Sequence, residues 1–62
     1  MKMSDEVRRM LNEAAEQLKL DGEMLAIASE LLEEQNPKWS KMMRSVSEMA
    51  DGKMVRIYEQ LD

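Results

Sequence analysis

Carboxylates are the only abundant side chains in this sequence that could do acid/base or metal chemistry. The first half of the chain holds the candidates, which are Glu13, Glu16, Glu30, Glu33 and Glu34. Two of them could act as general acid and base, or several could bind a hard cation through oxygen. A cation loop needs alternating oxygen donors around a sharp turn that a bidentate Glu closes, and residues 21–23 supply no such loop. We therefore expect solvated helix faces here and predict no metal site.

Other catalytic chemistries lack their essential groups. The chain has no Cys and no His, which removes thiolate nucleophiles, zinc thiolate sites and a proton shuttle near neutral pH. The candidate nucleophiles are Ser4, Ser29, Ser40, Ser45 and Ser47. None has a His base, a Gly-x-Ser-x-Gly elbow or a Ser-x-x-Lys motif, and two glycines 30 residues apart cannot form a phosphate loop. We predict a protein with no catalytic residues and no cofactor.

Charge is distributed unevenly between the two halves of the chain. Residues 1–35 carry four basic and nine acidic side chains, net −5, whereas residues 36–62 carry five basic and four acidic, net +1. The basic residues are Lys38, Lys41, Arg44, Lys53 and Arg56. They are few, diluted by acids and not interleaved with aromatic residues, so we expect no nucleic-acid partner. We interpret the asymmetry as complementarity that helps the two halves to dock.

Length and hydropathy bound the domain organisation and the compartment. Sixty-two residues, 44% of them apolar and 35% charged, allow one small helical domain over residues 1–62. No apolar run approaches the roughly 18 residues of a membrane-spanning helix, and residues 1–6 lack the apolar stretch of a signal peptide. We expect a soluble protein without membrane association and, by default, a cytoplasmic location.

Four residues are suited to begin helices. Helix-forming side chains dominate throughout, and the caps that break the pattern are Ser4, Asp21, Asn36 and Asp51. Apolar residues recur three, six, seven and ten positions after each cap, which is the pattern of an amphipathic helix. The sequence thus predicts an all-α fold, a compact bundle of four short helices arranged as two helical hairpins. The expected core is Val7, Leu11, Leu18, Leu25, Ile27, Leu31, Trp39, Met42, Val46, Met54, Ile57 and Leu61.

The same apolar positions also fit a different organisation. Steps of three and four residues continue across both Asp-Gly pairs, so two long helices that turn at Asn36-Pro37 could form a homodimeric four-helix bundle. Each glycine inside a helix would cost about 1 kcal/mol relative to alanine. For that reason we predict that Asp21-Gly22 and Asp51-Gly52 break the helices.

Methionine is the most distinctive residue type, with eight copies in a chain that has no Phe. Flexible thioethers can repack against varied partners, so a Met-rich helical surface could receive a partner helix. The residues predicted for such partner binding are Trp39, Met42, Met43 and Tyr58. An ordinary core in which Met fills gaps is the competing explanation, and a short chain favours it.

Two functional interpretations follow from these features. The first is an engineered or de novo designed helical scaffold without enzymatic activity, since the helices are fully punctuated and Cys and His are absent. The second is a natural acidic protein-protein interaction module, an adaptor or inhibitor, or a homodimer. A closed core and a featureless surface would favour the scaffold. Exposure of Trp39 or of the neighbouring Met residues would favour the interaction module.

Overall fold

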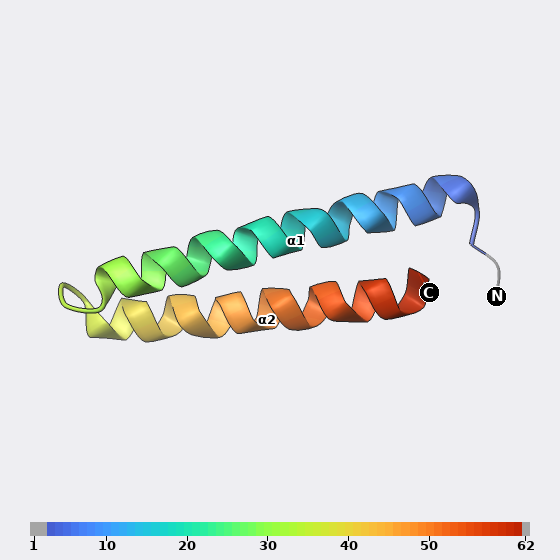
Figure 1. Cartoon of the computed structure of the whole chain (residues 1–62). Helices are drawn as coiled ribbons and strands as arrows, with labels where there is room; N and C mark the ends of the chain where they lie inside the picture. Colours follow the sequence, from blue (N-terminus) through green and yellow to red (C-terminus); the bar gives the residue numbers. More distant parts are fainter. Residues whose placement is uncertain (1–2, 62) are drawn as a thin grey trace.

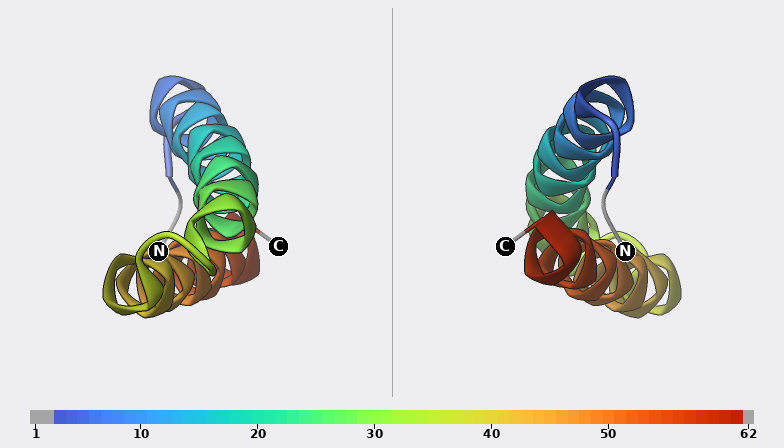
Figure 2. Two further views of the ribbon diagram at one scale, coloured as in Figure 1. Left: turned by 90° about the vertical axis from the view of Figure 1, so that its left-hand side faces the viewer. Right: turned by 90° about the vertical axis from the view of Figure 1, so that its right-hand side faces the viewer.

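Two long helices joined by a short turn make up the fold. The computed structural model describes residues 3–61, in which α1 spans Asp5–Leu32 and α2 spans Pro37–Leu61. The helices run antiparallel, so the start of α1 and the end of α2 lie at one end of the hairpin and the turn lies at the other (Figure 1). End-on views show that the helices cross at an incline (Figure 2). The molecule is therefore a narrow rod with Cα extents of 48 × 14 × 12 Å.

Both helices begin at a side-chain cap that the sequence predicts. The Ser4 hydroxyl accepts a hydrogen bond from the Val7 backbone N–H at 3.2 Å, and the Asn36 side-chain oxygen accepts one from Trp39 N–H at 3.2 Å. Each bond satisfies an N–H that has no partner within its helix. Pro37 follows Asn36 at the first helical position, where its missing N–H removes no helical bond.

The prediction of four short helices in two hairpins is wrong, because neither Asp-Gly pair interrupts a helix. Residues 21–22 lie inside α1 and residues 51–52 lie inside α2, and no glycine has a positive φ. Gly22 is buried against α2, where the missing side chain lets the helices approach closely and so offsets its low helix propensity. Gly52 has no such contact within 4 Å, yet α2 continues through it without a break.

Small side chains fill the line along which the two helices touch, here called the seam. Its buried residues are Ala15, Gly22 and Ser29 on α1 and Ser40, Ser47 and Ala50 on α2. The three on α1 are seven residues apart, the repeat of a helix that keeps one side against its partner. Half-buried larger residues flank them: Leu11, Leu18, Leu25, Leu32, Met43, Met54, Ile57 and Leu61.

Hydrogen bonds across the seam fix the register. Ser29 Oγ donates to the Ser40 carbonyl at 2.7 Å, and Ser40 Oγ donates in return to the Ser29 carbonyl at 2.6 Å. Farther along, Ser47 Oγ donates to the Gly22 carbonyl at 2.7 Å. The residue numbers of the two partners add up to 69 in each pair. Residue i of α1 and residue 69 − i of α2 therefore lie at the same height along the rod.

The expected core is only partly confirmed. Half of its members are half-buried beside the seam, but six are exposed, namely Val7, Ile27, Leu31, Trp39, Met42 and Val46. In the part of the chain that the structure describes, the only buried hydrophobic residues are Ala15 and Ala50. Two helices touch along one line only, so each buries one narrow stripe and leaves the adjacent apolar stripe outside.

Candidate protein-interaction surface

A groove runs between the helices on one side of the hairpin. It is lined by Leu18, Asp21 and Leu25 of α1 and by Val46, Met49, Ala50 and Lys53 of α2. A second depression shares two of these residues and extends along α1, with Asp21, Met24, Leu25 and Ala28 as its lining. These linings show that α1 and α2 present apolar side chains toward the same side of the molecule.

Seven-residue spacing extends this surface toward the turn. On α1, Leu31 follows Met24 by seven residues, and on α2, Met42 and Trp39 precede Met49 and Val46 by the same interval. Residues seven apart lie on the same side of a helix. We call the combined surface the apolar face and define it as Met24, Ala28, Leu31, Trp39, Met42, Val46 and Met49.

The side chains of the apolar face are open to solvent. Leu31 is 74% exposed, Met24 67%, Met49 58% and Trp39 50%. Single exposed apolar residues are ordinary on protein surfaces, but a contiguous set marks a site of association. An exposed fraction of a half or more at these four positions makes the apolar face a candidate site of association.

The four predicted partner-binding residues do not form one site. Trp39 and Met42 lie on the apolar face, as the interaction hypothesis requires. Met43 is half-buried in the seam, where it packs between the helices. Tyr58 is half-buried on the other side of the hairpin, in a depression that Glu16, Lys19, Leu20 and Glu23 also line. Met43 and Tyr58 thus belong to the packing of the hairpin and its polar side.

Polar and charged residues predominate on the side opposite the apolar face, where exposed Leu20 and Val55 also lie. Near the turn, a depression is lined by Glu33, Pro37, Ser40, Lys41 and Arg44. Valine provides a direct comparison of the two sides, because Val46 and Val55 are nine residues apart on α2 and so point in opposite directions. Only Val46 belongs to the groove. The hairpin is amphipathic as a whole unit.

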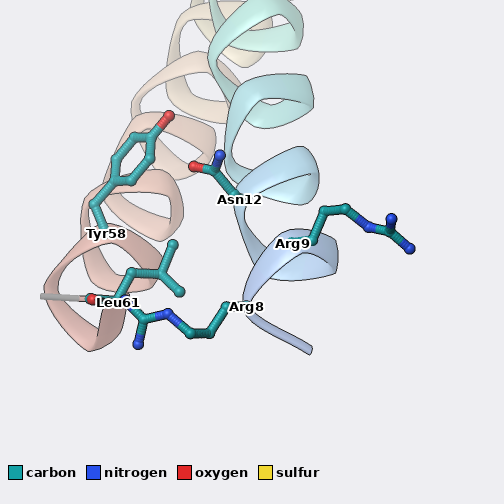
Figure 3. A pocket seen from close by; sticks show the side chains of 5 residues that line it. All are labelled: Arg8, Arg9, Asn12, Tyr58 and Leu61. Carbon is teal, nitrogen blue, oxygen red and sulfur yellow. Dashed lines mark hydrogen bonds between the residues drawn. The ribbon is translucent and has the colours of Figure 1, made fainter. Parts of the chain in front are cut away.

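A further depression lies at the end of the hairpin where α1 begins and α2 ends (Figure 3). Its lining is Arg8, Arg9, Asn12, Tyr58 and Leu61. The guanidinium of Arg8 reaches toward α2 and donates to the Leu61 carbonyl at 2.5 Å, while Arg9 points away from α2. Since Arg8 is already engaged with the last turn of α2, the two arginines do not converge on a common ligand.

Electrostatics distinguish the two helices. α1 carries three basic and seven acidic side chains, net −4, and α2 carries five basic and three acidic, net +2. Among residues 3–61, no group of three or more His, Cys, Asp or Glu side chains is arranged to hold a metal ion. No helix in that range is long and apolar enough to cross a membrane. The net negative charge of α1 and the net positive charge of α2 are electrostatically complementary when these helices pair.

The chain matches no protein-family model, and no curated protein and no solved structure is significantly similar to it. Its class therefore rests on its own geometry, which is that of an amphipathic antiparallel helical hairpin.

Reasoning from sequence misses Met24, Leu31, Val46 and Met49 as surface residues, and assigns two of them to the core. The spacing of small residues is the sequence signal that identifies the buried seam. Ala15, Gly22 and Ser29 recur at seven-residue intervals between the large apolar positions, a pattern typical of closely packed helices. A seam of small residues implies that larger neighbours lie outside it.

Proposed function

We propose that the chain is a protein-protein interaction module that associates with a second copy of itself through the apolar face, so that four helices share one core. The observation that supports this most strongly is the division of apolar side chains. Small residues fill the seam inside the hairpin, and six of the eleven exposed large hydrophobic residues lie on the apolar face.

Helix pairs of this kind need a second layer. Helical stability in proteins comes mostly from packing of an apolar side, and stable domains bury such sides between layers. Here the described residues include eleven large hydrophobic side chains that are exposed and only two buried hydrophobic residues, both alanines. Face-to-face association supplies the missing layer, and two hairpins then form a four-helix bundle.

The dimensions of the apolar side suit a stable dimer. The hairpin is 48 Å long, and two helices side by side are about 20 Å wide with their side chains. One side of the rod therefore offers about 900 Å², compared with the roughly 800 Å² that each partner buries in a typical stable complex. A second copy has the length to cover that side, and the apolar face makes up the half of it next to the turn.

Exposure of Trp39 bears on the two interpretations that the sequence leaves open. A designed scaffold with a closed core would hide this ring, whereas an interaction module would present it. Trp39 is half exposed on the apolar face, beside exposed Met42. This supports the interaction module. The scaffold interpretation, the lack of enzymatic activity, the lack of a nucleic-acid partner and the cytoplasmic location stay predictions.

The two valines on opposite sides of α2 provide a matched test. Val46 is 40% exposed and Val55 is 47% exposed, so V46E and V55E make the same chemical change at nearly equal exposure. We expect V46E to weaken self-association at least tenfold, because it places a carboxylate in an apolar interface at a cost above about 1.4 kcal/mol. V55E leaves association within about twofold of the unmodified chain.

Sedimentation equilibrium over a concentration series measures both variants directly. An unmodified chain that sediments as a monomer at every concentration would overturn the proposal. Equal weakening by V46E and V55E would also contradict it, because the effect would then be a general consequence of added negative charge. Helix content measured by circular dichroism confirms that each variant has folded.

A further inference from the structure

The apolar face as defined above lies in the half of the rod next to the turn, and in the other half exposed Met10 continues the α1 row, fourteen residues before Met24. The residues of the apolar face extend from Met24 to Leu31 on α1 and from Trp39 to Met49 on α2, both next to the turn. Toward the termini the same side of α2 becomes charged. Lys53 lines the groove, and Arg56 follows Met49 by seven residues. An apolar patch at one end of a rod constrains how two rods can be paired.

Two symmetric face-to-face arrangements exist for a pair of hairpins. A two-fold axis parallel to the helices places both turns at the same end and sets α1 of each copy against α2 of the other. An axis across the helices places the turns at opposite ends and sets α1 against α1 and α2 against α2. The two differ in which half of the rod meets which half.

Position along the rod favours the first arrangement. With the turns together, the apolar half of one copy covers the apolar half of the other over the full length of the hairpins. With the turns apart, full overlap would place the Lys53 and Arg56 half of each copy on the partner's apolar half. That arrangement would desolvate charges against apolar side chains, which is costly.

Charge favours the same arrangement independently. α1 is net −4 and α2 is net +2. With the turns together, each acidic α1 faces the partner's basic α2. With the turns apart, the two acidic α1 helices face each other and the two basic α2 helices face each other. Opposed like charges across an interface lower affinity and opposite charges direct the correct pairing.

We propose that the second copy binds with its turn at the same end, so that α1 of each chain packs against α2 of the other. This inference rests on the proposed self-association and specifies its geometry. An axis parallel to the helices preserves height, so residue i of α1 meets residue 69 − i of the partner's α2. Trp39 then packs between the partner's Ala28 and the partner's Leu31, and Glu13 comes level with the partner's Arg56.

A charge-reversal pair tests this geometry between chains. In an E13R homodimer, the new arginine at position 13 of each chain meets the partner's Arg56. In an R56E homodimer, Glu13 of each chain meets the partner's new glutamate at position 56. Mixed one to one, the two variants form a heterodimer in which every such contact again joins opposite charges. Exposed ion pairs contribute about 0.2–1 kcal/mol each, so we expect each variant alone to dissociate about three- to tenfold more easily. The mixture should regain the affinity of the unmodified chain.

A distance measurement gives a readout that does not depend on affinity. The chain has no Cys, so Q35C places a single spin label in the turn. Turns at the same end give an interlabel distance of roughly 20–30 Å, because packed helices lie about 10 Å apart and the labels add their own length. Turns at opposite ends with the rods in full overlap give a distance near the 48 Å length of the rod. The charge-reversal mixture excludes an offset pairing of the two apolar halves, because Glu13 does not meet Arg56 in it.

The outcomes separate the arrangement from the association. Monomers at all concentrations would overturn the proposed self-association and this inference with it. Dimers with a long distance between the Q35C labels, or an E13R and R56E mixture no tighter than either variant alone, would overturn only the arrangement. A short distance together with recovery in the mixture supports both.

Discussion

Replacing each glycine by alanine separates two reasons why glycine occurs inside these helices. Gly52 has nothing within 4 Å of the position of an added Cβ. An added Cβ at Gly22 would lie 2.7 Å from Asp51 Oδ1 and 3.5 Å from the Ser47 carbonyl oxygen. G52A therefore changes only the helix propensity, while G22A also changes the packing across the seam.

The expected magnitudes follow from those distances. Alanine favours a helix interior over glycine by about 1 kcal/mol, so we expect G52A to raise the free energy of unfolding by that amount. In G22A the Asp51 carboxylate must rotate away, and a displaced rotamer costs about 0.5–1.5 kcal/mol. The Ser47 carbonyl at 3.5 Å is in ordinary contact and stays in place. G22A should therefore raise the free energy of unfolding little or not at all.

Urea unfolding followed by circular dichroism compares the variants at one fixed protein concentration, since association contributes to the apparent stability. For a domain of this size, 1 kcal/mol also corresponds to a rise in melting temperature of about 4–8 °C. D51A serves as the background control. Once the Asp51 carboxylate is absent, G22A should raise the free energy of unfolding by about as much as G52A does.

Two results would refute this reasoning. Destabilisation by G52A would mean that Asp51-Gly52 interrupts α2. The cap pattern of the sequence predicts such a break. An equal gain for G22A and G52A with Asp51 present would mean that the close approach at Gly22 imposes no constraint on the seam.

Two further outcomes follow from the caps and from the apolar face. N36A removes the oxygen that accepts from the Trp39 N–H, so we expect it to lower the free energy of unfolding by about 1 kcal/mol. Q35A, one residue earlier in the turn, should change it by less than about 0.5 kcal/mol in the same urea titration. Trp39 is half exposed in the hairpin, so its fluorescence maximum should move to shorter wavelength as the concentration rises through the dissociation constant. A maximum that stays constant while the dimer forms would exclude Trp39 from the interface.

Helix starts are predictable from this sequence because capping is local. Ser4 and Asn36 act through a backbone N–H three residues away, so neighbouring sequence is sufficient to identify them. Asp21 and Asp51 have the same side chains and the same following glycine, yet neither begins a helix. At Gly22 the contacts across the seam come from Ser47 and Asp51, which are 25 and 29 residues away. No local pattern contains those contacts.

The candidate surface was only half predictable for a related reason. Apolar spacings of three and four residues define two adjacent stripes on each helix, and only the partner helix decides which stripe lies inside. Met42 and Met43 are neighbours in the chain, yet Met42 is exposed on the apolar face and Met43 is half-buried in the seam. Residue type cannot separate two methionines, whereas the register set by Ser29 and Ser40 does.

Close packing within the hairpin and association between hairpins have one physical origin. Small residues such as Gly22 and Ser47 allow the helices to touch, and this contact leaves little room between them for larger side chains. Six of the eleven exposed large apolar residues are consequently placed on the apolar face, where the proposed second copy removes them from water. Folding and association then share the same buried area. The melting temperature should accordingly rise with chain concentration, and V46E should lower both the affinity and the melting temperature.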